Sequence, residues 1–181
     1  MQIKIKGRNL LHTCRYSIMR LDLAHFTRSV AQPCRIEPLT TENIDARRTY
    51  SSFDARQREL IRNQPSRTQG WLFYVDEIEE PVSSMFALRR GAVDKFFKIR
   101  NIDVYLAMMY TPPEYRGRGY CRDMMTLVLK ELRQDEIEFA HLAVRPNNLA
   151  AVKLYEKLGF EQIDVKRFAR VLRYNIPYYT L

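Results

Sequence analysis

The chain reads Tyr110-Thr111-Pro112-Pro113-Glu114-Tyr115-Arg116-Gly117-Arg118-Gly119-Tyr120-Cys121 where an apolar run, residues 104–110, meets an amphipathic segment that starts near Arg122. Glycines allow a backbone to approach a ligand closely, and the first turn of a helix presents N–H groups and a dipole that favour an anion. No Ser, Thr, Asp or Asn stands at the helix start to cap these donors, so a phosphate can satisfy them. The stretch therefore predicts a strand, a phosphate-binding turn and a helix.

Basic side chains surround this turn. Arg116, Arg118 and Arg122 place three positive charges near the predicted helix start. A basic turn rich in glycine is also a common solvated corner of a protein surface, and the turn alone does not separate the two interpretations. A second stretch, farther along the chain, separates them.

The second stretch, Leu142-Ala143-Val144-Arg145-Pro146-Asn147-Asn148 and the residues up to Phe160, has the pattern of a strand followed by a capped helix. The apolar run 139–144 predicts a strand, which Pro146 ends because proline donates no ladder hydrogen bond. Either asparagine of the stretch can cap the next helix, and Gly159 suits the left-handed residue after its end. The apolar face of this helix is marked by Ala151, Tyr155 and Leu158.

Together, the two stretches resemble the GCN5-related N-acetyltransferase family, which transfers an acetyl group from acetyl-CoA to an amine. The pyrophosphate loop of that family, Arg/Gln-x-x-Gly-x-Gly/Ala, is matched by Arg116, Gly119 and, imperfectly, Cys121. The later motif of the family, Asn-x-x-Ala-x-x-Leu-Tyr-Glu-x-x-Gly-Phe, is matched here by Asn148, Ala151, Leu154, Tyr155, Glu156, Gly159 and Phe160. The resemblance is strong over residues 100–162 and extends weakly back to Arg35.

The resemblance implies a set of cofactor-binding residues. Backbone N–H groups of the loop would hold the CoA pyrophosphate, and the loop consists of Arg116, Gly117, Arg118, Gly119, Tyr120 and Cys121. Met109 and Thr111 would bind the pantetheine arm through their backbone, and Asn148 would contact the same arm. Tyr155 would lie near the thioester sulfur and protonate the leaving thiolate. From the helix pattern alone, Tyr155 would be an ordinary core tyrosine.

The general base is less well defined. Histone-type members of the family carry a Glu on the central strand, six residues before the position of Thr111, and that position is Tyr105 here. Asp103 lies on the same strand face, two residues earlier, and is the predicted base. His141 on the next strand is the second candidate, with a buried structural histidine as its alternative. Other options are Glu138, Tyr110 and the absence of a dedicated base.

Charge and cysteine content limit the other classes of function. The 181 residues include 30 Lys and Arg and 21 Asp and Glu, giving a net charge of +9 that is spread along the chain without a long basic run. We therefore expect no nucleic-acid partner and no membrane partner. The spacing of Cys14, Cys34 and Cys121 resembles no metal-ligand motif, so we expect a cytoplasmic protein without a metal site. The thiol of Cys121 is either activated by the helix N-terminus or buried and inert.

The pattern of elements predicts an α/β fold with a mixed, mostly antiparallel twisted sheet and flanking helices, open at the central strands for CoA. A single domain, 1–181, is expected, in which residues 1–33 form an extension that is atypical of the family and packs on the sheet. A helix is predicted over residues 41–62. Strands are predicted over residues 35–39, 70–76, 82–88, 103–110, 139–144, 165–174 and 178–181.

The predicted function is acetyl-CoA-dependent N-acetylation of a primary amine on a small molecule or sugar, by direct attack, in a monomer or homodimer. Leu142-Ala143-Val144-Arg145 is similar to the Leu-Glu-Val-Arg of the ribosomal-protein N-terminal acetyltransferases, but Ala143 replaces the Glu expected as their base. This difference counts against a protein N-terminus as acceptor. The alternatives are a protein N-terminal or lysine acetyltransferase and a non-catalytic CoA-binding or sensor module.

Overall fold

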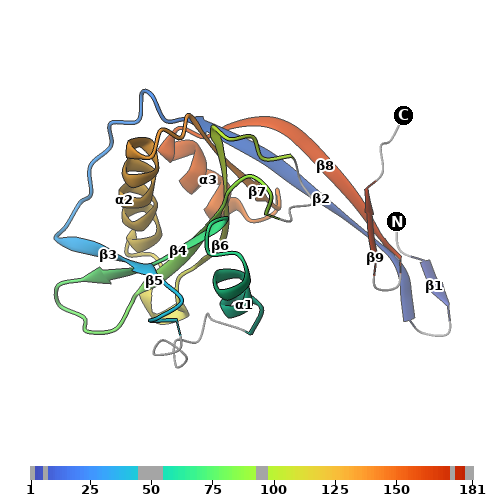
Figure 1. Ribbon diagram of the computed structural model, residues 1–181. Helices are drawn as coiled ribbons and strands as arrows, with labels where there is room; N and C mark the ends of the chain where they lie inside the picture. Colours follow the sequence, from blue (N-terminus) through green and yellow to red (C-terminus); the bar gives the residue numbers. More distant parts are fainter. Residues whose placement is uncertain (1–2, 6–7, 45–54, 93–97, 172–173, 178–181) are drawn as a thin grey trace. The chain divides into compact units, whose positions relative to one another are not determined.

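The structure is a computed structural model that describes residues 3–5, 8–44, 55–92, 98–171 and 174–177 (Figure 1). The chain divides into two compact units. The smaller unit contains Met1–Arg20 and Leu142–Leu181, and the larger unit contains Leu21–His141. The expectation of a single domain over 1–181 stays a prediction.

The order of elements alternates strands with a few helices. In chain order they are β1 (Ile3–Ile5), β2 (Arg8–Asp22), β3 (Cys34–Leu39), α1 (Ala55–Asn63), β4 (Thr68–Val75), β5 (Ser83–Leu88), β6 (Asp103–Tyr110), the short 3-10 helix η1 (Pro113–Tyr115), α2 (Tyr120–Gln134), β7 (Phe139–Val144), α3 (Leu149–Leu158), β8 (Glu161–Val171) and β9 (Tyr174–Pro177). β2 and β7 each contribute residues to both units. The strands predicted over 103–110 and 139–144 are confirmed to the residue.

Of the helix predicted over 41–62, residues 55–62 are helical in the structure, whereas residues 41–44 are not. The described residues after Thr40 form a turn, in which the Thr40 hydroxyl accepts hydrogen bonds from the backbone N–H of Glu42 and Asn43, each at 3.2 Å. A side chain that satisfies the backbone in this way supports a turn as readily as a helix start. Residues 45–54 lie outside the described residues, and α1 begins only at Ala55.

The sheet of the larger unit runs in the order β3-β4-β5-β6-β7. The first three pairings are antiparallel, and β6 pairs with β7 in parallel through three registered pairs, from Asp103 with Phe139 to Tyr105 with His141. A parallel neighbour requires a crossover, which η1 and α2 provide. The predicted mixed, mostly antiparallel sheet with flanking helices is therefore confirmed.

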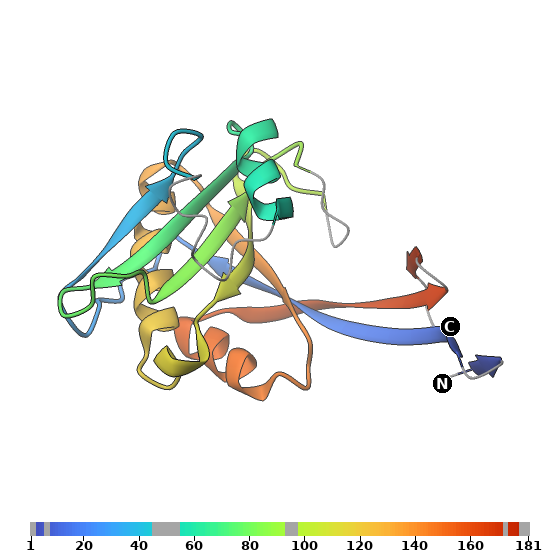
Figure 2. The ribbon, with the colours of Figure 1, turned by 90° about the horizontal axis from the view of Figure 1, so that it is seen from below.

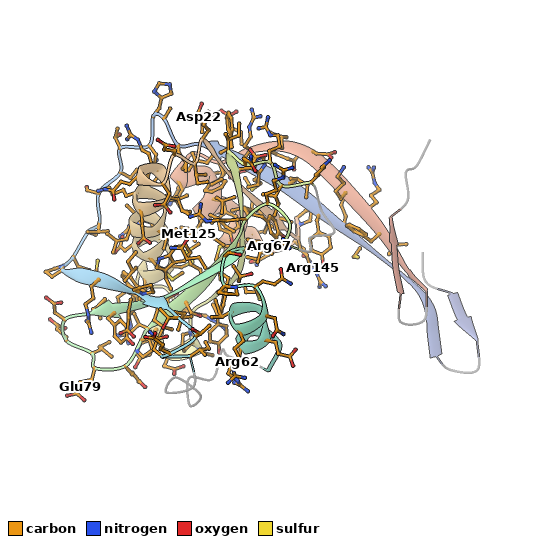
Figure 3. The ribbon with its side chains drawn as sticks, viewed as in Figure 1. Asp22, Arg62, Arg67, Glu79, Met125 and Arg145 are labelled. Atoms are coloured by element: carbon orange, nitrogen blue, oxygen red, sulfur yellow. The ribbon has the colours of Figure 1, made fainter. Side chains whose placement is uncertain are left out.

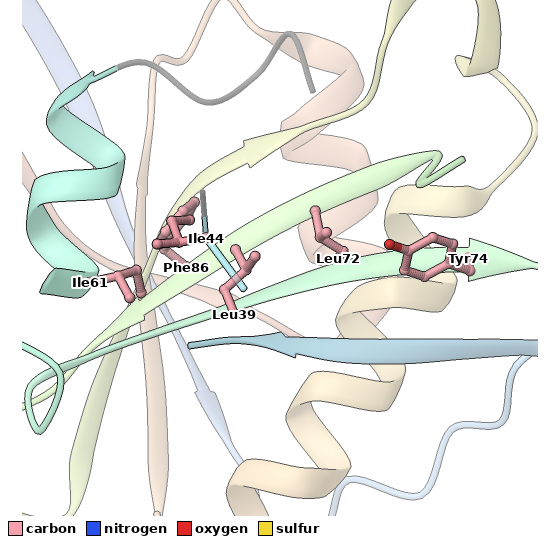
Figure 4. Packing of buried hydrophobic residues seen from close by; sticks show 6 residues of the cluster. All are labelled: Leu39, Ile44, Ile61, Leu72, Tyr74 and Phe86. Atoms are coloured by element: carbon pink, nitrogen blue, oxygen red, sulfur yellow. The ribbon is translucent and has the colours of Figure 1, made fainter. Parts of the chain in front are cut away.

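Strand β4 is buried on both of its faces. Successive side chains of a strand point to opposite sides of the sheet, so different elements cover the two faces. Trp71 donates from Nε1 to Glu131 of α2 at 3.1 Å. Leu72 and Tyr74 point the other way and belong to a cluster with Ile61 of α1 (Figure 4). The remaining members of this cluster are Leu39, Ile44 and Phe86. The two helices thus cover opposite faces of the same strands (Figure 2).

In the smaller unit, β2 and β8 form a long antiparallel pair, which runs from Leu11 with Val171 to Arg20 with Glu161 (Figure 1). β1 pairs with β2, and β9 pairs with β8. Residues 8–22, within the predicted N-terminal extension, are therefore a strand. The strand predicted over 165–174 begins four residues earlier, and residues 178–181 lie outside the described residues.

Among the described residues, no helix combines the length and the apolar character that crossing a membrane requires. Within the same residues, no group of His, Cys, Asp and Glu side chains has the arrangement of a metal site. All three cysteines are free thiols.

Candidate active site

The central strand β6 bends just before its end. Ala107 pairs with Phe86 and Tyr110 pairs with Ser84. Between these two pairs β6 advances by three residues, whereas β5 advances by only two. The extra residue makes a β-bulge, and Met108 within it has a φ of 53°. A β-bulge bends the strand locally, and such bulges are common beside functional sites. The distortion falls directly before Met109, to which the family resemblance assigns the pantetheine arm.

The segment that leaves β6 is fixed by side chains from two directions. The hydroxyl of Ser83 donates to the Tyr110 carbonyl at 2.8 Å and lies 2.8 Å from the Thr111 hydroxyl. Arg116 donates from Nε to the Thr111 carbonyl at 3.0 Å. Arg116 therefore holds the loop's own backbone with one of its donors. These contacts lock the strand end from which the loop starts.

The loop itself uses two glycines in the left-handed region. Gly117 has a φ of 79°, and Gly119, the N-cap of α2, has a φ of 83°. A Cβ added at Gly119 would lie 3.1 Å from the Arg122 guanidinium, whereas one at Gly117 would meet nothing within 4 Å. Among the described residues no side chain caps α2, and its first intrahelical bond runs from Asp123 N–H to Gly119 O at 3.1 Å. The predicted uncapped helix N-terminus is confirmed.

A buried carboxylate stands in the first turn of α2, and sequence reasoning missed it. The Asp123 side chain is 1% exposed and accepts from Arg122 Nε through Oδ1 at 2.9 Å. Among the described residues, its Oδ2 has no hydrogen-bond partner. The hydrogen bond from Arg122 to Asp123 raises the pKa of the Arg122 guanidinium. The only available signal was an acidic residue in the first helical turn, which usually indicates a surface charge at the helix dipole.

The Cys121 thiol is partly buried at the start of α2. Burial raises the pKa of this thiol to about 11, although a hydrogen bond with Thr111 acts in the opposite direction. The thiolate, which is the reactive form, is therefore scarce at neutral pH. The raised pKa is expected for the unreactive thiol of the two interpretations, and the reactivity of Cys121 stays a prediction.

We expect alkylation of Cys121 by iodoacetamide at pH 7.5 to be roughly 10²-fold slower than that of an ordinary thiol, because so little thiolate is present. Mass spectrometry would follow the rate at this residue, and the same thiol in urea-unfolded protein provides the reference. Equal rates in folded and unfolded protein would contradict the burial argument.

The other two predicted site residues, Asn148 and Tyr155, lie at the N-cap of α3 and within this helix of the smaller unit. Asn148 is its N-cap, accepting from the Ala151 N–H through Oδ1 at 3.4 Å. Gly159 ends the helix with a φ of 100°, and Phe160 N–H donates to the Tyr155 carbonyl at 2.9 Å. The Tyr155 ring is largely buried and packs against Phe160 with centroids 6.0 Å apart. Both predicted caps of α3 are confirmed, and they fix the position of Tyr155.

The predicted base, Asp103, begins β6 and is 3% exposed. Arg100 donates hydrogen bonds to the Asp103 carboxylate from Nε at 2.7 Å and from Nη2 at 2.9 Å. His141 Nε2 lies 3.4 Å from Asp103 Oδ1. Burial alone would raise the pKa of Asp103, but the hydrogen bonds from Arg100 and the charges of His141 and Arg100 outweigh it and lower the pKa. Six residues of strand, about 20 Å, separate Asp103 from Met109. The role of Asp103 as base stays a prediction, and these contacts favour a structural role.

Asp103→Asn should lower the free energy of unfolding at pH 7 by about 1–3 kcal/mol, because it removes a buried, hydrogen-bonded charge. A carboxylate with a lowered pKa stabilises the fold above its unfolded pKa, and this contribution is lost as the pH falls through the folded pKa. Urea denaturation at pH 7 and pH 3 should therefore show a difference between wild type and variant that shrinks in acid. A difference of the same size at both pH values would refute this account.

Comparison with known proteins completes the description of the site. A model of the acetyltransferase (GNAT) family matches residues 34–160, from the start of β3 to the end of the second motif. A ribosomal protein bS18-alanine N-acetyltransferase of Haemophilus ducreyi is 33% identical over 55 residues, which are 30% of this chain and 38% of that protein. A mycothiol acetyltransferase of Nocardiopsis dassonvillei is 42% identical over 52 residues, 29% of this chain and 16% of that protein. The matched stretches thus span well under half of either relative.

The fold has counterparts among solved structures. A GCN5-related N-acetyltransferase from Kribbella flavida superimposes with a TM-score of 0.62 at 14% sequence identity, covering 88% of this chain and 58% of that one. At this identity the likeness concerns the fold alone.

Proposed function

Because this chain belongs to the acetyltransferase (GNAT) family, we propose that it is an N-acetyltransferase that uses acetyl-CoA as donor and a primary amine of a small molecule or sugar as acceptor. The observation that carries the proposal is the uncapped N-terminus of α2 behind two left-handed glycines. That turn presents backbone donors and a positive dipole end, and no side chain in the described part of the chain caps them.

In this proposal the backbone of residues 117–121 binds the diphosphate of CoA, and Arg116 is left out of the predicted set of N–H donors because its N–H donates to the Pro113 carbonyl at 3.2 Å. The charges of Arg118 and Arg122 add to the helix dipole, since an anion gains from both. The pantetheine arm is assigned to the backbone of Met109 and Thr111, where the bulge and the Ser83 contacts support a fixed strand end. Asn148 uses its Oδ1 to cap α3, so its amide nitrogen is the group assigned to the arm.

The proposed reaction is direct transfer. The neutral amine nitrogen attacks the thioester carbonyl carbon, a C–N bond forms and the C–S bond breaks. Tyr155 donates its phenolic proton to the leaving thiolate, while the amine's surplus proton passes to a base or to solvent. The backbone N–H of Met109 is assigned to the oxyanion that develops on the carbonyl oxygen.

The acceptor has two candidates. The relative named as a mycothiol acetyltransferase supports a small molecule. The relative named as a ribosomal-protein acetyltransferase supports a protein N-terminus, but Ala143 occupies the position of the acid expected for that branch. We therefore place the small-molecule acceptor first.

Two measurements test the proposal. Calorimetry with acetyl-CoA should show binding at one site per chain. Release of free CoA should then identify the acceptor in a panel of amines, amino sugars and peptides. A folded protein that binds no acetyl-CoA would overturn the proposed function, and turnover with peptides alone would replace the small-molecule acceptor by the protein acceptor.

A further inference from the structure

A cavity of about 310 Å³ lies within the smaller unit. Its walls come from β2 and from the connection between β7 and α3, and they consist of Thr13, Cys14, Arg15, Arg145, Pro146 and Asn147. Because successive side chains of a strand point to opposite faces, a cavity lined by three consecutive residues lies along the edge of that strand. The volume is at the lower end of the range found for small-molecule sites.

The cavity carries positive charge that the described protein does not neutralise. Arg15 and Arg145 both line it, and Arg15 stands directly opposite Arg167 in the β2–β8 register. Like charges in such a pair destabilise a sheet unless something compensates them. Among the side chains that the structure describes, no carboxylate forms an ion pair with any of these three arginines. Arg15 and Arg145 are both exposed to solvent, so their charges are accessible to an anionic ligand.

Arg145, labelled in Figure 3, is held in a defined orientation. Its guanidinium carbon lies 5.8 Å from the centroid of the Tyr16 ring, and a hydrogen bond with Tyr16 raises the pKa of the guanidinium. A planar guanidinium that is fixed in this way recognises the two oxygens of a carboxylate or phosphate group better than a mobile ammonium does. Thr13 and Asn147 add a hydroxyl and an amide to the same cavity.

We propose that this cavity binds the carboxylate or phosphate group of the acyl acceptor, which makes the acceptor an acidic amine such as an amino acid or a phosphorylated amino sugar. The assignment of the anion to the acceptor rests on the proposed function. The cavity adjoins the N-terminus of α3, whose dipole also favours an anion, and α3 carries Tyr155. The phosphate groups of CoA carry negatively charged oxygens of the same kind. The experiment must therefore distinguish an anionic group of the acceptor from a phosphate group of CoA.

Cys14 provides a reporter inside the cavity. Iodoacetate is an anion and iodoacetamide is neutral, so a positive cavity raises the ratio of the two alkylation rates at this thiol. We expect the ratio at Cys14, read by mass spectrometry, to fall about 3- to 10-fold in Arg145→Gln. Lys153→Gln, which removes one charge from the exposed face of α3, should leave it unchanged, as should Cys34 measured in the same digest. An unchanged ratio at Cys14 in Arg145→Gln would overturn the proposal.

Calorimetry of the CoA-saturated protein identifies the source of the anion. The probes are two matched pairs, glucosamine 6-phosphate with glucosamine and alanine with ethylamine. At least one acidic member should bind about 10-fold more tightly than its neutral partner, and Arg145→Gln should abolish the preference without changing the affinity for acetyl-CoA. Equal binding within both pairs, or a loss of acetyl-CoA affinity in Arg145→Gln, overturns the assignment to the acceptor. If wild type binds no acetyl-CoA, the proposed function fails, while the Cys14 ratio still decides whether the cavity attracts anions.

Discussion

Gly119→Val is expected to weaken acetyl-CoA binding by about 10²-fold, the effect of losing about two of the charge-assisted hydrogen bonds that the proposed function assigns to the turn. Gly119 has a φ of 83°, which a β-branched residue adopts only with strain. Its added Cβ would also press on the Arg122 guanidinium at 3.1 Å. The backbone must therefore shift, or Arg122 must leave the helix N-terminus, and both changes degrade the anion site.

The measurement is calorimetric titration of acetyl-CoA into wild type and variant, with circular dichroism to show that the variant is folded. Gly117→Val is the matched control, because it places the same β-branched residue at a left-handed position of the same turn. It carries the same left-handed strain, at a φ of 79°, but its Cβ meets no atom within 4 Å. We expect a smaller loss of affinity in this control. A folded Gly119→Val protein with wild-type affinity would remove the turn from the proposed cofactor site.

Tyr155→Phe is expected to lower turnover by about 10²–10⁴-fold, the usual contribution of a general acid. The substitution removes only the hydroxyl, so the ring can keep its packing against Phe160 and the two caps of α3 stay in place. The affinity for acetyl-CoA and the thermal midpoint should therefore change little. Rates must be measured with an acceptor for which the chemical step limits turnover.

The control for this prediction is Tyr74→Phe. Tyr74 is also a buried tyrosine, but it belongs to the cluster that packs α1 on the sheet, so loss of its hydroxyl should leave turnover unchanged. If Tyr155→Phe retains wild-type turnover, Tyr155 is a packing residue and the proton reaches the thiolate by another route. If both variants lose turnover equally, the effect of Tyr155→Phe reflects general destabilisation.

The amino-acid sequence by itself determined the local parts of this protein. Asn148 and Gly159 bound α3 as expected, because capping depends on the chemistry of a few adjacent residues. Residues 103–110 form a strand for the same kind of reason, since apolar β-formers followed by prolines leave few alternatives. The turn at Gly117 and Gly119 was also readable, because glycine is the residue that adopts a left-handed backbone without strain.

Only the tertiary structure decided the contacts between residues that are distant in the chain. The contacts of Arg100 and His141 with Asp103 are an example, because His141 reaches Asp103 only through the parallel register of β6 and β7. The bulge at Met108 likewise depends on the register with β5, which local patterns do not set. The cavity beside Arg145 exists because β2, far away in the chain, is built into the sheet of the smaller unit through its pairing with β8. Burial shifts the pKa of an ionisable side chain, and the burial of a side chain is set by the packing of the whole chain.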